Sequence, residues 1–486
     1  MTTSPHVSVP ADHPPDAIVI GSGPNGLSAA ITLAQAGLSV TVYEAESAIG
    51  GGTRSAELTL PGFLHDVCSS VHPMAASSPF FQSLDLPRFG LRWITPDAAL
   101  AHPFPDGDAA IIANPFDGNL AQFGPDARAV RALLAPLVKN WAALSPELLA
   151  PLRLSAHLPK LARFGWDAIQ PASRIARRFR TEKARTVFAG IAAHSMLPLD
   201  RWISSATALV LWATCYSVGW PFAAGGSQSI ASALAKCLES LGGKIVTGAR
   251  IADLAKLPKS HAILCDITPR QLLSLVGGQI SPSERRDLEQ YRYGPGVFKL
   301  DWALDAPIPW KSSACLRAGT VHLGAGYDEI AASESAAWSD TPSERPFVLL
   351  AQPSLFDPSR APAAKHTAWA YCHVPHGASF DMTDPIEAQI ERFAPGFRRR
   401  ILARSMMFPR DFERHNANII GGDIGAGSMD LGQFFTRPSR RLYATSLPNV
   451  FLCSASTPPG PGVHGMCGHL AARRALRRCF GKGQGR

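Results

Sequence analysis

The chain has 486 residues, enough for two domains with large hydrophobic cores. Its nine cysteines form no C-x-x-C pair, which argues against a disulfide framework and a zinc site and is typical of a reducing cytoplasm. The formal charge is +9 and is spread among many arginines and 41 prolines, so we expect no nucleic-acid partner. Residues 1–14 lack the apolar core of a secretory signal and are predicted to be a disordered leader.

The stretch Asp16–Glu44 predicts a nucleotide-binding βαβ unit. Ala17–Ile20 is an apolar run of the kind that forms a buried parallel strand, and it leads into GSGPNG, which matches G-x-G-x-x-G. In such a loop Gly21 allows the tight turn, Gly23 lets a pyrophosphate approach the backbone, and Gly26 lets the helix pack on the strand.

A helix and a second strand complete this unit. The helix has apolar residues at helical spacing and is expected to stop at Gly37. The strand Ser39–Tyr43 follows and ends at Glu44, an acidic residue about 20 positions beyond the glycines. A dinucleotide site uses such a residue to hold the adenosine ribose hydroxyls.

The next block resembles a known family. Gly50-Gly51-Gly52 and Pro61-Gly62-Phe63 resemble the N-terminal signature of the flavoprotein amine oxidase and phytoene desaturase superfamily. Within it, the chain is similar to the phytoene desaturase-like FAD-dependent oxidoreductases, which include carotenoid desaturases and isomerases. The resemblance implies noncovalent FAD in the βαβ unit. Many relatives carry Arg directly after the glycine pair, where this chain has Gly52, and Arg54 either supplies that charge or is a solvated loop residue.

An inserted helical domain is predicted from about Pro87 to Ile203. Between Arg153 and Arg185, nine Lys or Arg stand against two acids, with Leu, Phe and Trp between them. Such a stretch can lie on an anionic membrane surface or form a solvated helix face. The following Ile203–Ala235 carries no charge but is broken by glycine and proline, so it predicts a helix lining an apolar pocket rather than a membrane span.

The chain then returns to the nucleotide domain. We expect a helix over Ser227–Leu241 and strands at Lys244–Thr247 and His261–Leu264, the latter closing at Cys265-Asp266. Between them lies Ile251. The resemblance implies that its backbone contacts the adenine ring, and a core isoleucine is the other interpretation.

A second insertion runs from about Ser281 to Arg414 and contains the catalytic candidate. Gly296–Leu304 fits a sheet strand. Lys299 within it resembles the strand lysine of the amine oxidase branch, which approaches flavin N5 through a water. A cation there can stabilise charge that develops during electron transfer. The alternative is an exposed strand lysine.

The C-terminal segment resembles the flavin-facing motif of the superfamily. A strand, Val450–Leu452, is followed by a turn rich in proline and glycine and by a helix predicted to start near Val463. A helix N-terminus carries about half a positive charge, which would stabilise an anionic reduced flavin. The usual glycine after the strand is replaced by Cys453-Ser454.

The predicted site therefore combines one catalytic residue, Lys299, with a set of cofactor contacts and no metal. The residues expected to contact FAD are Gly21, Ser22, Gly23, Gly26, Glu44, Ala45, Gly51, Gly52, Arg54, Ile251, Ser454, Gly462 and Val463.

The predicted fold is α/β: a Rossmann-like FAD-binding domain of the glutathione-reductase type with an inserted α+β substrate domain. The first domain would comprise residues 15–85, 215–280 and 415–486, and the second residues 86–214 and 281–414.

The expected function is hydride transfer to flavin N5 from a hydrophobic, isoprenoid or carotenoid-like substrate, in desaturation or flavin-assisted isomerisation. Dioxygen or a quinone would accept the electrons, and the cytoplasmic protein could contact a membrane peripherally. An FAD-dependent amine oxidase and a flavin-stabilised scaffold without turnover remain as alternatives, because fold alone cannot choose among them.

Overall fold

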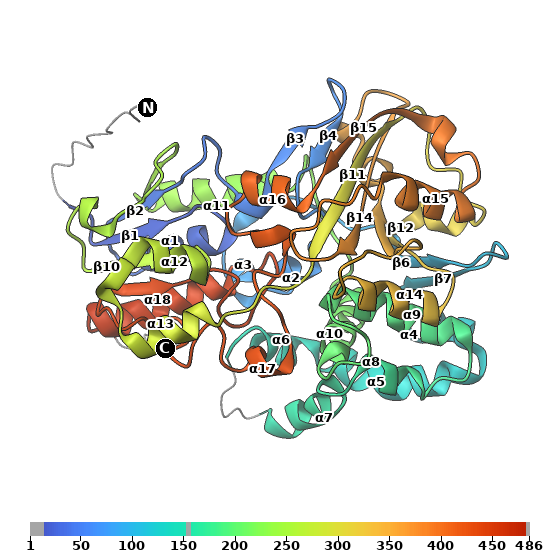
Figure 1. Ribbon diagram of the computed structural model, residues 1–486, viewed down its shortest axis with the longest axis horizontal. Coiled ribbons are helices and arrows are strands. Elements are labelled where there is room, and N and C mark those ends of the chain that lie inside the picture. The colour runs from blue at the N-terminus through green and yellow to red at the C-terminus, as the bar shows by residue number, and fades with distance from the viewer. Residues whose placement is uncertain (1–13, 152–156, 483–486) are drawn as a thin grey trace.

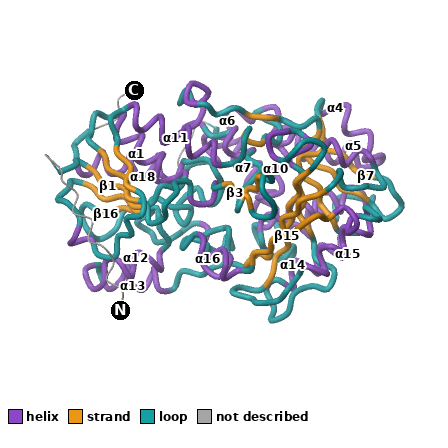
Figure 2. The backbone as a smooth tube through the Cα atoms, turned by 90° about the horizontal axis from the view of Figure 1, so that it is seen from above, coloured by secondary structure: helices purple, strands orange, loops and turns teal. Residues whose placement is uncertain are grey.

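The computed structural model describes residues 14–151 and 157–482. The predicted leader lies outside these ranges apart from Pro14, so the structure says nothing of it. Two main sheets organise the described chain, and they lie toward opposite ends of the molecule (Figure 1, Figure 2). The space between them contains the site described below.

The smaller sheet is parallel and has five strands in the order β16-β10-β1-β2-β9. Segments far apart in the sequence supply these strands, which are β1 (Ala17–Ile20), β2 (Val40–Tyr43), β9 (Lys244–Val246), β10 (Ala262–Cys265) and β16 (Val450–Leu452). Because the strands are parallel, their carboxyl ends meet at one edge, where ligands bind in open α/β sheets.

Helices cover both faces of this sheet. Successive side chains of a strand point to opposite faces, and in β1 Ala17 and Val19 join one core while Ile18 and Ile20 join another. The first core contains α1 (Pro24–Gln35), α11 (Gln228–Ser240) and α18 (Met466–Cys479), and the second contains α12 (Pro269–Val276) and α13 (Pro282–Glu289).

The larger sheet has seven strands in the order β15-β11-β14-β13-β12-β6-β7. Both insertions contribute, because β6 of the first pairs in parallel with β12 of the second. The strands are β6 (Ala98–Pro103), β7 (Ala109–Ala113), β11 (Gly296–Leu304), β12 (Ala318–Leu323), β13 (Val348–Ala351), β14 (His366–Val374) and β15 (Ile401–Met407).

The strand β11 has the predicted bounds, but all nine of its residues are buried. One face, with Phe298, Leu300 and Trp302, packs in a core with α15 (Thr383–Phe393). The other face carries Val297 and Lys299, which line a cavity. The lysine is therefore not an exposed strand residue.

The first insertion is mainly helical, as predicted, but also contains the hairpin β6–β7. Both strands are rich in alanine, which is depleted in strands, so the sequence gives a weak strand signal. The remaining helices are α2 (Pro73–Ala76), α3 (Pro79–Gln82), α4 (Phe116–Asn119), α5 (Ala127–Lys139), α6 (Trp141–Leu148), α7 (Leu158–Ala168), α8 (Ala172–Ala176), α9 (Glu182–Ala192), α10 (Ser204–Ser217), α14 (Tyr327–Ala336), α16 (Pro409–His415) and α17 (Leu431–Phe434).

The smaller strands form two pairs, β3 (Ser55–Glu57) with β4 (Leu64–Asp66) and β5 (Trp93–Ile94) with β8 (Phe222–Ala223). Within residues 14–151 and 157–482, no helix has the length and apolar character needed to cross a bilayer.

The helices α1 and α18 approach so closely that glycine is required at their contact. A methyl group added at Gly468 would lie 1.8 Å from the backbone oxygen of Asn25, and one at Gly26 would lie 2.1 Å from the backbone oxygen of Gly21. Both distances are far shorter than any van der Waals contact. The two glycines thus fix the C-terminal helix and the first strand against the same end of α1.

We predict that Gly468→Ala destabilises the protein. Alanine stabilises a helix interior by about 1 kcal/mol relative to glycine, but overpacking costs about 1–3 kcal/mol, and here the clash is with rigid backbone. The thermal unfolding midpoint should therefore fall. Gly278→Ala is the control, because no atom lies within 4 Å of its added methyl group. Equal midpoints for the two variants would contradict the packing argument.

Candidate functional site

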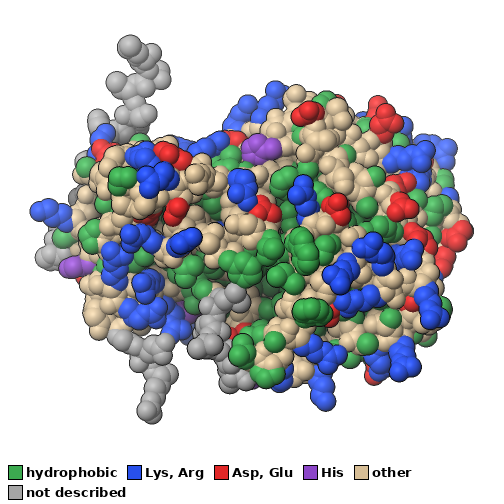
Figure 3. Space-filling view, turned by 60° about the horizontal axis from the view of Figure 1, so that its bottom comes forward, with side chains coloured by type: hydrophobic (Ala, Val, Ile, Leu, Met, Phe, Trp, Pro, Cys, Tyr) green, Lys and Arg blue, Asp and Glu red, His purple; other side chains and the backbone are tan. Residues whose placement is uncertain are grey.

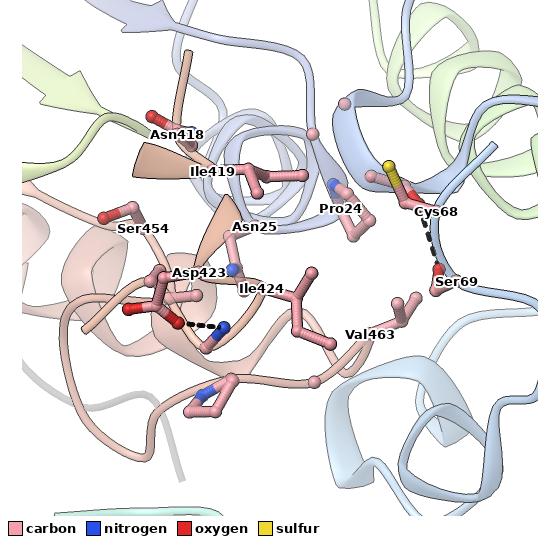
Figure 4. Close-up of a pocket in the computed structure, with 18 of the residues that line it drawn as sticks. Pro24, Asn25, Cys68, Ser69, Asn418, Ile419, Asp423, Ile424, Ser454 and Val463 are labelled. Atoms are coloured by element: carbon pink, nitrogen blue, oxygen red, sulfur yellow. Dashed lines mark hydrogen bonds between the residues drawn. The ribbon is translucent and has the colours of Figure 1, made fainter. Parts of the chain in front are cut away.

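One cavity of about 650 Å³ runs from the glycine loop of the parallel sheet to the face of the seven-stranded sheet. All the predicted cofactor contacts except Ser22 and Gly26 line it, and Lys299 lines it too. Figure 4 shows part of its wall, where distant segments supply Asn25, Cys68, Ile424 and Val463. The structure thus brings the predicted residues together, while their individual roles stay predictions.

The glycine loop has the shape that the motif predicts. Gly21 has φ +98°, which favours glycine, and α1 begins at Pro24 with Gly23 as its N-cap. A methyl group added at Gly23 would lie 2.8 Å from Asp266 Oδ2. A side chain at position 23 would therefore collide with the carboxyl group of Asp266, as well as with any ligand that approaches this backbone.

Glu44 is buried against the same loop. Its Oε2 accepts hydrogen bonds from the backbone N–H of Ser22 at 2.8 Å and from Ser22 Oγ at 2.6 Å, and its Oε1 accepts from the Glu46 N–H at 2.9 Å. Glu44 also lines the cavity, close in sequence to Ala45 and opposite Ile251 on the loop after β9. Glu44 therefore both closes the glycine loop and presents an acidic wall to a bound ligand.

Asp266 is a second carboxyl group at this edge, and the sequence did not identify it as a site residue. It follows β10, the parallel neighbour of β1, and its Oδ2 accepts a hydrogen bond from the Gly26 N–H at 2.9 Å. Burial raises the pKa of Asp266 to about 7, the Gly26 N–H opposes this, and the nearby Glu44 charge adds to it. The only sequence signal was its place directly after a predicted parallel strand.

The second glycine block packs directly on the first loop. The Gly50 N–H donates to the Ser22 carbonyl at 3.1 Å, and a methyl group added at Gly51 would lie 3.3 Å from the Gly23 Cα. Gly52 and Arg54 then line the cavity, and the buried Nε of Arg54 has no hydrogen-bond partner among the described residues. Arg54 therefore adds a partly buried guanidinium group to the cavity wall, and its role toward the cofactor stays a prediction.

The C-terminal motif needs one correction. The helix α18 begins at Met466, three residues after Val463, and the Met466 N–H donates to His464 Nδ1 at 3.0 Å. The turn residues Gly462, Val463 and His464 line the cavity instead of the helix start. The prolines and glycines of the turn have no helical periodicity, so the sequence placed the start too early.

Ser454 lines the cavity next to this turn, and its hydroxyl donates to the Ile267 carbonyl at 2.7 Å. This bond ties the loop after β16 to the loop after β10. The hydroxyl is thus engaged within the protein, which leaves the backbone of this loop as the part that can approach a ligand.

A buried charge network lies at the far end of the cavity. Lys299 Nζ pairs with the Asp301 carboxylate two residues along β11, and both side chains are almost fully buried. His65 Nδ1 lies 3.4 Å from the other oxygen of Asp301, and His65 Nε2 lies 2.8 Å from Thr59 Oγ1. Asp301 and His65 were not predicted, since they come from separate segments that the fold brings together.

Aromatic side chains continue the wall beside Lys299. Antiparallel pairing places Tyr371 opposite Lys299 and Trp369 opposite Asp301. The two rings are stacked, with centroids 5.7 Å apart and planes at 3°, and Lys299 Nζ lies 5.9 Å from the centre of the Trp369 ring. The lysine therefore sits beside a flat aromatic surface that faces the cavity.

The remaining wall is largely apolar and comes from the helical insertion. Its main polar feature is His194, whose Nε2 lies 3.0 Å from His322 Nε2. Burial lowers the pKa of His194 to about 3 and that of His322 well below its usual range, so both rings are neutral. Within the described part of the chain, no group of His, Cys, Asp or Glu is arranged to hold a metal ion. The apolar lining residues include Leu148, Leu149, Phe164, Ile203, Ala206, Val210 and Leu211.

Comparison with known proteins agrees with this fold. Residues 19–85 match the model of the NAD(P)-binding Rossmann-like domain. The chain is 25% identical to pyridine nucleotide-disulfide oxidoreductase domain-containing protein 2 of Rattus norvegicus, over 95% of this chain and 93% of that protein. It is also 25% identical to phytoene dehydrogenase of Streptomyces griseus, over 96% of each chain.

Solved structures share the fold at low identity. An oxidoreductase from Methanosarcina mazei superposes with a TM-score of 0.63 at 15% identity, covering 95% of this chain and 99% of that one. Putrescine oxidase bound to putrescine gives 0.62 at 14% identity, covering 97% and 100%.

The fold and site therefore define a mixed α/β protein with a Rossmann-like dinucleotide-binding domain, as predicted. The predicted resemblance to the phytoene desaturase-like oxidoreductases and the amine oxidases is confirmed, because named proteins of both kinds match nearly the whole chain.

We predict that Asp266→Asn stabilises the protein more at pH 8 than at pH 5. The pKa of Asp266 is higher in the folded than in the unfolded chain, so its contribution to stability is complete below about pH 4 and is lost as the pH rises through about 7. Asparagine can still accept from Gly26 without a charge. Thermal unfolding of both proteins at the two pH values measures the effect, and a difference in midpoint that does not change with pH would contradict it.

Proposed function

We propose that the chain is an FAD-dependent oxidoreductase that acts on a hydrophobic, isoprenoid or carotenoid-like substrate by hydride transfer to flavin N5, in desaturation or flavin-assisted isomerisation. The observation that carries this proposal is the single cavity, which joins a dinucleotide loop at one end to an apolar wall at the other. A ligand held at the glycines can therefore extend to the place where an apolar substrate would lie.

The residues present fit FAD. The glycine loop lies at the N-terminus of α1, whose partial positive charge attracts a pyrophosphate, although Glu44 and Asp266 already bind the Ser22 and Gly26 N–H groups. Glu44 stands at the ribose end, and Arg54 carries a buried Nε with no partner among the described residues. When bound there without a covalent link, FAD supplies a ring that accepts hydride. An unpartnered buried guanidinium atom is costly, and an anionic or carbonyl group of the cofactor would satisfy it.

Lys299 is the proposed catalytic residue. Its ammonium group is held on the cavity wall by Asp301, which also lies near His65. A buried cation at a fixed position can stabilise negative charge without reorganisation of the site. Asp301 acts through Lys299 and is a positioning residue.

The hydrophobic substrate class is supported by the far wall of the cavity. Helix α10 lines it with Ala206, Val210 and Leu211, and α7 adds Phe164. Apolar surface of this kind contributes about 25 cal/mol per Å² of substrate buried, and it offers no partner for a charged group. The similarity to phytoene dehydrogenase is consistent with such a substrate.

An amine oxidase is the second candidate, and the stacked pair Trp369 and Tyr371 beside Lys299 favours it. An aromatic surface can hold an amine substrate through cation–π contacts. The apolar wall argues for the first candidate, since its described residues are mainly aliphatic or aromatic and offer a diamine little to bind.

The proposal is tested by mixing the FAD-loaded protein without oxygen with a polyene such as phytoene in detergent and, separately, with putrescine. We expect the polyene to bleach the flavin absorbance and the diamine to leave it unchanged. Bleaching by amines alone would instead support the amine oxidase. Chromatography of the recovered polyene detects isomerisation, which leaves the flavin oxidised. Bound FAD that neither compound bleaches, together with a polyene recovered unchanged, would support a scaffold without turnover.

We predict that Lys299→Met slows reoxidation of the dithionite-reduced, FAD-loaded protein by dioxygen about a hundredfold, because a fixed group that stabilises developing charge is worth roughly 10²–10³ in rate. Stopped-flow absorbance measures the rate. Lys299→Met alone leaves the Asp301 carboxylate buried without its partner, which destabilises a protein by about 3–5 kcal/mol. The double variant Lys299→Met/Asp301→Asn removes both charges. It therefore separates an effect on catalysis from an effect on folding.

The exposed Lys236→Met on α11 is the matched control and should reoxidise at the wild-type rate. A double variant that folds and also reoxidises at the wild-type rate would show that Lys299 serves only as the partner of Asp301.

A further inference from the structure

Helix α7 has two apolar sides, and only one of them is used inside the protein. Leu161 and Phe164 pack on the helical core. On the outer side, Leu158, Trp166 and Ile169 are 50%, 72% and 36% exposed. Together with Ala162 they recur at i, i+4, i+8 and i+11, the spacing of one helix face. This outer stripe adds nothing to the core, so its exposure requires another explanation.

A further exposed aromatic residue extends the stripe. Trp202 is 51% exposed, and the next residue, Ile203, donates its backbone N–H to the Ile169 carbonyl at 2.8 Å. Trp202 therefore lies beside the end of α7. Seen with the bottom of the molecule turned forward, the surface has hydrophobic side chains toward its middle and many Lys and Arg side chains around them (Figure 3).

The charges beside the stripe are mainly positive. Lys160 and Arg163 are exposed on α7 along one edge of the stripe, and Arg201 is exposed next to Trp202, with the exposed Asp200 adjacent to it. The acid on the helix, Asp167, is paired with Arg178 at 2.7 Å. An apolar strip bordered by exposed cations is the pattern of a helix that lies in a membrane interface.

The same helix forms part of the cavity. Phe164, on the inner side of α7, lines the main cavity, and it also borders a second cavity of about 230 Å³ together with Lys160 and Arg163. The exposed stripe is thus separated from the apolar end of the site by the thickness of one helix. A hydrophobic molecule dissolved in a bilayer would meet the protein at this place.

We infer that the outer face of α7, with Trp166 at its centre and Lys160 and Arg163 beside it, docks on an anionic lipid bilayer. A second copy of the chain fits less well, because a twofold contact through this face would bring these cations against one another. A surface of phosphate headgroups supplies the opposite charge, and the acyl region accepts the tryptophan and the aliphatic side chains. Docking does not depend on the proposed reaction.

The test is co-sedimentation of the full chain with vesicles of phosphatidylcholine alone or mixed with phosphatidylglycerol. We expect binding to the mixed vesicles only, with release at high salt because the attraction is screened. Each cation near an anionic surface contributes about a fivefold factor, so Lys160→Gln/Arg163→Gln should weaken binding roughly 30-fold. Trp166→Ala should weaken it about tenfold through lost apolar contact.

The matched control is Lys256→Gln/Lys259→Gln, which makes the same change in net charge at exposed positions beside the parallel sheet. It should bind like the wild type. Equal loss in both charge variants, or no binding to mixed vesicles, would overturn the inference. A dimer in sedimentation velocity that Trp166→Ala dissociates would also overturn it and identify a second copy as the occupant. Flavin bleaching by a substrate is unaffected by these outcomes.

Discussion

The backbone contacts at the first turn of α1 are the constraint on which the cofactor end of the structure depends. Gly26 lies against the Gly21 carbonyl, and Gly468 of α18 lies against the Asn25 carbonyl. These contacts leave no room for side chains, so strand, helix and C-terminal segment have one arrangement. The position of the loop after β10, with Asp266, follows from it, since Asp266 accepts the Gly26 N–H. The cavity opens from this fixed corner.

The charge of the cavity wall changes along its length. Carboxylates dominate at the glycine loop, the cations Arg54 and Lys299 lie further along, and the helical wall beyond is apolar. Burial lowers the pKa of His415 to about 4, and the charges of Arg54 and Lys299 contribute to this shift, so both cations act on the same neighbourhood. A molecule with hydroxyl groups at one end, an anionic middle part and a flat apolar far end matches this sequence of environments.

Most of the first domain could be predicted because its signals are local. Short local patterns in the sequence predict the glycine loop, the helix after it and Glu44. The strand around Lys299 also has the expected bounds. Asp301 and His65 could not be paired from sequence, because their contact joins residues more than 200 positions apart. The start of α18 was missed for a different reason, since a turn rich in proline and glycine gives no boundary signal before Met466.

Buried ion pairs between the two domains bear on how the cavity keeps its arrangement. Asp66 on β4 pairs with Arg360 at 2.7 Å, and His65 beside it contacts Asp301. Burial alone would raise the pKa of Asp66, but Arg360 and three hydrogen-bond donors hold it at about 2. Hinge opening would separate these partners at a cost of about 3–5 kcal/mol for each broken pair. These contacts therefore resist any motion that draws β4 away from the segments that carry Arg360 and Asp301, and they keep the cavity wall around Lys299 in one arrangement.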